Sequence, residues 1–138
     1  MRFMVLVKAT PTTEAGVMPT AAQLSEMGKF NQALIDAGVL LDASGLKPTA
    51  HAARVQYRGA TQRVIDGPFA EAKELVAGYW IWQCTSMAEA LEWARRCPNP
   101  AFDGDGELEI RPLFEMSDFP DVPPEVARMA AEAAERKG

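Results

Sequence analysis

The stretch Asp66-Gly67-Pro68-Phe69-Ala70-Glu71-Ala72-Lys73-Glu74 runs directly into the most apolar segment of the chain, residues 75–82. Pro68 fixes its own φ and disfavours helix at Gly67, and glycine tolerates backbone angles that other residues avoid. These residues predict a stiff loop at the edge of a strand. Such a loop can hold polar side chains in fixed positions, as a polar site requires. The polar side chains in question are Asp66, Glu71, Lys73 and Glu74.

Composition favours one compact domain. The chain has 138 residues, 48% of them apolar, which is enough for a real core. A net charge of −5 argues against a general affinity for nucleic acid or anionic membranes. No apolar run approaches the roughly 18 residues of a membrane span. Residues 1–8 resemble a first strand more than a signal peptide, and Cys84 and Cys97 as two reduced thiols indicate a cytoplasmic protein.

Hydrophobic periodicity predicts strands and helices in the order β-α-β-hairpin-β-α-β, followed by a terminal helix. Residues 10–19 are expected to form a loop. The predicted strands are residues 2–9, 39–46, 54–58, 62–66, 75–85 and 107–111, and the predicted helices are 20–37, 86–96 and 124–136.

The first long helix has clear start and stop signals. Thr20 and Gln23 form a capping box, and Gly38 ends the helix. Gly28 is expected to permit close packing against the sheet, and Asn31 to point away from it. The apolar positions at helical spacing are Leu24, Met27, Phe30, Leu34 and Ile35.

Residues 75–85 are apolar on both faces of the predicted strand, with Trp80 and Trp82 on one face and Tyr79 and Ile81 on the other. A sheet covered by helices on one side should show one polar face. The second face therefore needs a cover. A second subunit with its sheet facing this one is the simplest cover, and the C-terminal tail folding back is the alternative.

The chain resembles the DGPF family, a branch of the YCII-related proteins. The resemblance rests on residues 66–74 and on three further segments in the family's order: 39–48, 86–90 and 109–113. It implies a YCII-related domain over residues 1–116, followed by a Pro-rich linker and peripheral helix over 117–138. The implied fold is α+β: a ferredoxin-like antiparallel sheet with two helices on one face, paired into a homodimer of the dimeric α/β-barrel type.

The resemblance implies no firm activity, so candidate residues are weighed on their chemistry. Asp66 is the candidate catalytic acid or base, and the alternative is a turn residue whose carboxylate caps the following loop. Lys73 and Arg111 would orient an anionic ligand, although an Arg111 salt bridge to Glu109 or Asp66 is an equal alternative. Residues expected to line the same cleft are Glu71, Glu109, Tyr79 and Trp80, the aromatic pair forming an apolar wall.

Two functions stay open. In the first, a small polar or anionic organic molecule binds in a cleft, with cofactor-free chemistry of an isomerase or lyase type. In the second, the chain is a non-catalytic binding or regulatory module, since proteins resembling this family often occur beside alternative sigma factors. Convergence of Asp66, Lys73 and Arg111 in one cavity favours chemistry, and their dispersal over the surface favours the module.

The sequence carries no recognisable cofactor or metal site. His51 is the only histidine and is expected to be an exposed loop residue. One histidine and two separated cysteines make no recognisable ligand set. No phosphate-binding loop, serine nucleophile elbow or dinucleotide fingerprint is present.

Overall fold

Four antiparallel strands form the central sheet of the computed structural model, which describes residues 1–102 and 104–137 but not the side chains of residues 73 and 137. The order across the sheet is β2-β5-β1-β6. The strands are β1 (Arg2–Lys8), β2 (Leu40–Gly45), β5 (Val76–Gln83) and β6 (Leu108–Pro112). This mixed α+β arrangement is compatible with the ferredoxin-like fold that the sequence predicts.

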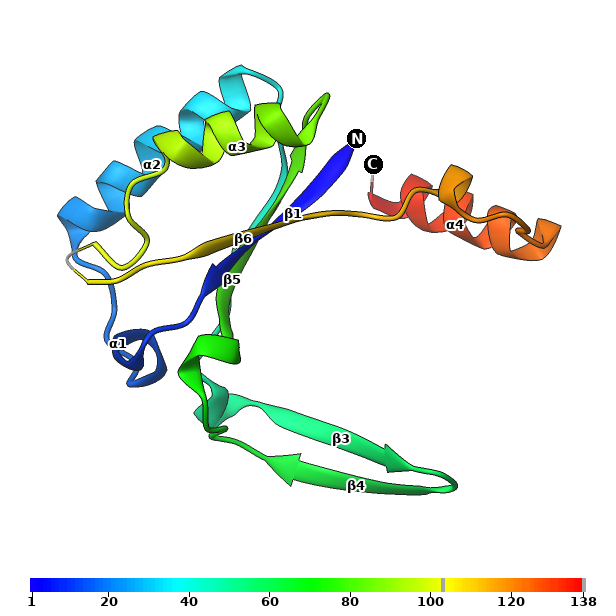
Figure 1. The fold of residues 1–138 in the computed structure, drawn as a ribbon, viewed down its shortest axis with the longest axis horizontal. Helices are drawn as coiled ribbons and strands as arrows, with labels where there is room; N and C mark the ends of the chain where they lie inside the picture. Colours follow the sequence, from blue (N-terminus) through cyan, green and yellow to red (C-terminus); the bar gives the residue numbers. More distant parts are fainter. Residues whose placement is uncertain (103, 138) are drawn as a thin grey trace.

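Helices α2 (Ala21–Asp36) and α3 (Met87–Arg96) cover one face of the sheet (Figure 1). The predicted loop at residues 10–19 is in part wrong, because it contains α1 (Pro11–Glu14). Thr10 caps this short helix and Pro11 supplies the first helical residue, a position where the missing amide hydrogen costs nothing. The described residues also form three 3-10 turns: η1 (Thr49–His51), η2 (Ala72–Glu74) and η3 (Met116–Asp118).

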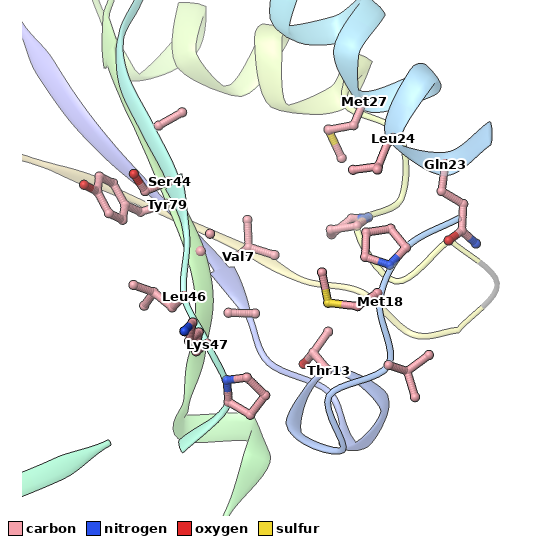
Figure 2. Close-up of a pocket in the computed structure, with 18 of the residues that line it drawn as sticks. Val7, Thr13, Met18, Gln23, Leu24, Met27, Ser44, Leu46, Lys47 and Tyr79 are labelled. Carbon is pink, nitrogen blue, oxygen red and sulfur yellow. The ribbon is translucent and has the colours of Figure 1, made fainter. Parts of the chain in front are cut away.

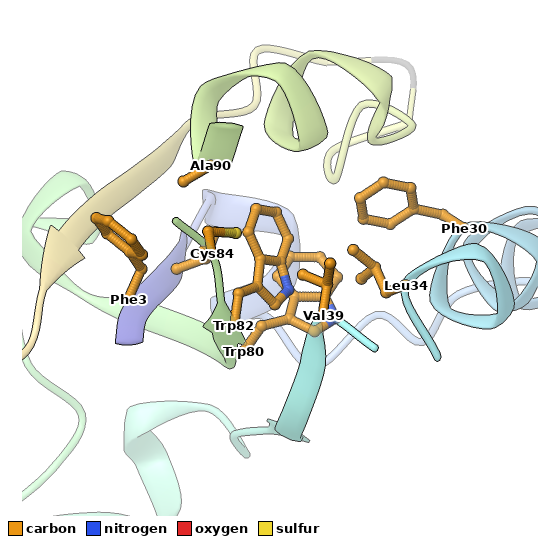
Figure 3. Packing of buried hydrophobic residues seen from close by; sticks show 9 residues of the cluster. Phe3, Phe30, Leu34, Val39, Trp80, Trp82, Cys84 and Ala90 are labelled. Atoms are coloured by element: carbon orange, nitrogen blue, oxygen red, sulfur yellow. The ribbon is translucent and has the colours of Figure 1, made fainter. Parts of the chain in front are cut away.

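The core lies between the sheet and these two helices (Figure 3). Phe30 meets the indoles of Trp80 and Trp82 edge-on, with ring centroids 5.9 and 6.2 Å away. Offset and edge-on aromatic pairs are the favourable geometries. The buried side chains of the cluster are Phe3, Val5, Phe30, Leu34, Val39, Trp80, Trp82, Cys84 and Ala90.

Helix α2 starts at the predicted capping box, where Thr20 accepts from the Gln23 amide and Gln23 accepts from the Thr20 amide. Two predictions for this helix are wrong. Asn31 does not point away from the sheet, because its Oδ1 accepts a hydrogen bond from Trp80 Nε1 at 2.8 Å. Gly28 is exposed, and a Cβ there would meet nothing within 4 Å, so it mediates no close packing.

Strands β3 (Ala53–Arg58) and β4 (Thr61–Asp66) pair only with each other, as a separate two-stranded sheet. We call this hairpin the arm, because it projects from the body of the molecule (Figure 1). The predicted hairpin and the position of Asp66 at its end are confirmed.

The face of the sheet opposite α2 and α3, here called the open face, carries Met4, Leu6, Tyr79 and Ile81. Helix α4 (Pro124–Lys137) lies off the sheet (Figure 1). Its apolar residues Val126 and Met129 are exposed. The terminal tail therefore does not cover the open face, and this alternative is wrong. No helix within residues 1–102 and 104–137 is long and apolar enough to cross a membrane.

Candidate functional site

A cavity of about 860 Å³ lies between the N-terminal half of α2, the ends of β2 and β5, and the loop that follows α1 (Figure 2). We call it the α2 cavity. Its volume falls within the range of about 300–1,000 Å³ that small-molecule sites occupy. Its apolar lining includes Val7, Met18, Leu24, Met27, Leu46, Trp80 and Phe102.

The polar groups of the α2 cavity are few and come from separate elements. Lys47 is the one charged side chain among the described lining residues, which include no aspartate or glutamate. His51 of η1 lines the same cavity, and Thr13 and Gln23 add neutral polar groups. A mostly apolar wall with one cation suits a ligand with an apolar body and one anionic or strongly polar group.

Thr49 connects three elements close to Lys47 and His51. Its hydroxyl donates to Glu14 Oε2 of α1 at 2.5 Å, and its amide donates to Glu14 Oε1 at 3.1 Å. The same hydroxyl accepts from the Phe69 amide at 3.0 Å. A single side chain therefore ties α1, η1 and the loop after β4 together.

The Asp66–Phe69 loop packs directly on this turn. The Gly67 amide donates to the Ala52 carbonyl at 2.9 Å, and the Arg54 guanidinium lies 3.7 Å from the centre of the Phe69 ring. Gly67 does not have a φ in the left-handed region, so its backbone angle is not why glycine stands here. The loop fixes η1 by contact, and η1 carries His51 to the cavity.

Two of the sequence-predicted site residues line the α2 cavity. Trp80 is buried, and its indole is held by Asn31. Tyr79 also belongs to the lining, but Figure 2 shows its ring pointing away from the cavity. The Tyr79 hydroxyl instead donates to Asp42 Oδ2 at 3.3 Å. This follows from the alternation of side chains along β5, which sends neighbours to opposite faces.

The other predicted site residues are dispersed. Asp66 is exposed at the end of β4, and its carboxylate makes no hydrogen bond to any side chain or amide that the structure describes, which disfavours the capped turn. Glu71 is exposed with φ 67°, the left-handed region. The side chain of Lys73 lies outside the described residues.

Glu109 and Arg111 lie opposite Leu6 and Met4 in the ladder between β6 and β1. Both therefore belong to the open face, on the other side of the sheet from the α2 cavity. The nearest partner of Glu109 is Lys8, at 3.9 Å. Neither of the two predicted salt bridges of Arg111 is present among the described residues. Neither Asp66 nor Arg111 lines the α2 cavity.

Neither cysteine is poised as a nucleophile. Burial raises the pKa of Cys97 to about 11, and burial together with the nearby Glu89 carboxylate raises the pKa of Cys84. At neutral pH both are thiols, whereas the thiolate is the reactive form. Among the described residues no three His, Cys, Asp or Glu side chains gather into a group that could hold a metal ion.

Comparison with known proteins places the chain in a family. Residues 1–117 match the YCII-related domain. The chain belongs to the YCII-related family. An uncharacterised protein of Rhizobium meliloti (strain 1021) is 36% identical over 90 residues, which cover 65% of this chain and 72% of that protein. The YCII-related match spans all the strands, α1–α3 and the α2 cavity.

The site residues that the sequence reasoning missed in this YCII-related chain are Lys47, His51 and Asn31. A signal existed for one of them, because Lys47 lies in the segment Gly45–Pro48 that carries part of the family resemblance. No local pattern reveals that Asn31 faces the indole of a tryptophan 49 positions further on. His51 is exposed, as expected, yet it also lines the cavity.

Proposed function

We propose that this YCII-related protein, as a member of the DGPF branch, binds a small organic acid in the α2 cavity. The observation that carries the proposal is the charge of the lining. Lys47 is the one charged described residue in a mostly apolar lining, in a chain whose net charge is −5. An ammonium group beside an apolar wall favours a carboxylate on a hydrocarbon or aromatic body.

Binding without chemistry is the form that the geometry supports better. A general acid or base must come within hydrogen-bonding reach of the proton it moves, and Asp66 is not among the residues that line the α2 cavity. Cofactor-free acid–base chemistry at Asp66 is the second candidate, in which Lys73, Glu71, Glu109 and Arg111 would act around a separate ligand. The dispersal of Asp66 and Arg111 favours a binding or regulatory module. A link to a sigma factor is part of the proposal that the protein is such a module.

We also propose a homodimer in which the open faces of two copies pack together. Met4, Leu6 and Ile81 support it, because they give the centre of this face an apolar, half-buried surface on the side of the sheet away from α2 and α3. The free thiols Cys84 and Cys97 favour a cytoplasmic location. The net charge of −5 disfavours nucleic acid as a partner.

The ligand proposal is tested by thermal shift with a panel of small aryl and alkyl carboxylates, their lactones and their neutral amides. A ligand that binds the native state raises the melting temperature as its concentration exceeds its dissociation constant. We expect carboxylates to stabilise the protein and the matching amides to stabilise it less. Lys47→Gln should weaken carboxylate binding about tenfold, the loss expected for one charge-assisted contact.

Two further variants sharpen the test. Lys29→Gln removes an exposed lysine on the outer side of α2 and should leave binding unchanged. Asp66→Asn should also leave binding unchanged if the α2 cavity is the site. Equal losses in Lys47→Gln and Lys29→Gln would refute the Lys47 contact. A loss confined to Asp66→Asn would move the site to the loop and favour acid–base chemistry.

A further inference from the structure

The arm leaves apolar surface uncovered. Val55 pairs with Val64, and Tyr57 lies on the same face of the ribbon. Tyr57 is 69% exposed and Val64 67% exposed. An isolated two-stranded hairpin is marginally stable at best in water, and a contiguous exposed apolar patch marks an interaction surface. The arm therefore needs a partner surface.

The C-terminal segment, residues 113–129, has the same property. The rings of Phe114 and Phe119 contact each other at an interplanar angle of 39°, with centroids 5.2 Å apart, yet Phe114 is 75% exposed. Met116 and Met129 in the same segment are exposed as well. The segment is tied to the sheet at its start, where Arg2 Nε donates to Glu115 Oε1 at 3.0 Å. Beyond that contact it presents its apolar side chains to solvent.

The charges of the two surfaces are complementary. The arm carries three arginines against one acidic residue at its base: Arg54, Arg58 and Arg63, with Asp66. The C-terminal segment carries four acidic residues against one arginine: Glu115, Asp118, Asp121 and Glu125, with Arg128. Opposite potentials across an interface steer association and fix its register. The arginines project from the other face of the ribbon, but it is only two strands wide, so their long side chains can reach its edges.

The arm and the C-terminal segment of one protomer leave the sheet at opposite ends. In the sequence the arm lies between β2 and β5. It leaves the sheet at the end where Lys8 pairs with Val76. The C-terminal segment leaves from the opposite end, where Phe3 pairs with Pro112. Both project to the side of the sheet away from α2 and α3 (Figure 1). In a dimer with facing open faces, a two-fold axis that lies between the sheets, parallel to them and perpendicular to the strands, brings the arm end of one copy to the C-terminal end of the other.

We propose that the arm of each copy docks on the C-terminal segment of a second copy of this chain. The inference rests on the proposed homodimer and adds its specific contacts: Val55, Tyr57 and Val64 against the Phe114–Phe119 pair, with Arg58 and Arg63 beside Asp121 and Glu125. An isologous dimer makes this contact twice, once at each end of the paired sheets.

A charge exchange tests the docking. The arm variant is Arg58→Glu with Arg63→Glu, and the segment variant is Asp121→Lys with Glu125→Lys. Asp118 is left alone because its carboxylate caps η3 through the Glu115 amide. Each variant alone places like charges at both contacts, whereas a mixed dimer of the two places opposite charges at both. The dissociation constant is measured by sedimentation velocity, and the composition of the dimers by native mass spectrometry.

We expect each variant alone to dimerise about tenfold more weakly or worse, and the mixture to form mixed dimers about as tightly as wild type. The control Lys29→Glu with Arg95→Glu makes the same change in net charge as the arm variant, but on α2 and α3, and should dimerise as wild type does. Undiminished dimers that mix at random would overturn the docking while leaving the sheet-to-sheet dimer intact. A monomeric wild-type protein would overturn both.

Discussion

Gly67 lies so close to Thr49 that a Cβ built on Gly67 would come within 1.7 Å of the Thr49 carbonyl oxygen. The atom in the way belongs to the backbone, which cannot rotate aside as a side chain does. Glycine is therefore required at this position by space. The contact joins the Asp66–Phe69 loop to η1, the turn that carries His51 to the α2 cavity.

Gly67→Ala should destabilise the protein by about 1–3 kcal/mol, because the loop and the Thr49–Ala52 turn must separate to admit the methyl group. Chemical denaturation measures the free energy of unfolding. Gly28→Ala is the matched control: Gly28 is exposed in the middle of α2, and its Cβ would meet nothing within 4 Å. That change should stabilise by up to about 1 kcal/mol through helix propensity. Equal effects of the two substitutions would contradict the packing described for Gly67.

The two core tryptophans should differ in their tolerance of phenylalanine. Trp80 Nε1 donates to Asn31, whereas the buried Trp82 Nε1 has no described hydrogen-bond partner. Trp80→Phe breaks a hydrogen bond and leaves Asn31 unpaired, while Trp82→Phe removes an unsatisfied donor. With a similar loss of volume, Trp80→Phe should cost about 1 kcal/mol more in the free energy of unfolding. A larger cost for Trp82→Phe would show that its donor is satisfied in solution.

Acid should weaken the fold through Glu89 and Glu115. Hydrogen bonds from the side chain and amide of Thr85 lower the pKa of Glu89, and a hydrogen bond from the Arg2 guanidinium lowers the pKa of Glu115. The folded state then binds fewer protons than the unfolded state. Their stabilisation is complete above the ordinary glutamate pKa of 4.5 and is lost as the pH falls through the lowered values.

The urea midpoint, measured between pH 7 and pH 3, tests this dependence. Glu89→Gln and Glu115→Gln should each flatten the decline at low pH, since the substituted side chain no longer titrates. Glu92→Gln, on the same helix as Glu89 and exposed, serves as the control. Identical profiles for wild type and all three variants would rule out these two carboxylates as the source of the acid sensitivity.

Local sequence signals predicted the elements well. Three of these signals act within one turn or one strand, so neighbouring residues suffice to predict the element. They are the capping box at Thr20, the stop at Gly38 and the alternation of residues 107–111. The alternation along residues 75–85 likewise placed Trp80 and Trp82 on one face of β5, and both side chains are buried. These are the parts of the fold that depend on contacts close in sequence.

The α2 cavity could not be predicted in the same way, because it is built by residues from distant segments. Met18 follows α1, Lys47 follows β2, and Phe102 follows α3, and only the tertiary fold brings them together. The loop of residues 66–74 shows the same limit of local sequence signals. Its charged residues drew attention to Asp66, whereas its contacts through Gly67 and Phe69 are with the turn at Thr49.

The indole N–H signal of Trp80 in a two-dimensional NMR spectrum offers the most direct test of ligand binding in the α2 cavity. The chain has three tryptophans, and Trp93 of α3 is not among the lining residues, so its signal is an internal control. Titration with an aryl carboxylate should move the Trp80 signal saturably, leave the Trp93 signal in place, and show a weaker effect in Lys47→Gln. Trp80 and Trp93 signals that stay fixed, or that drift together without saturating, across the whole panel of carboxylates would contradict the proposed site.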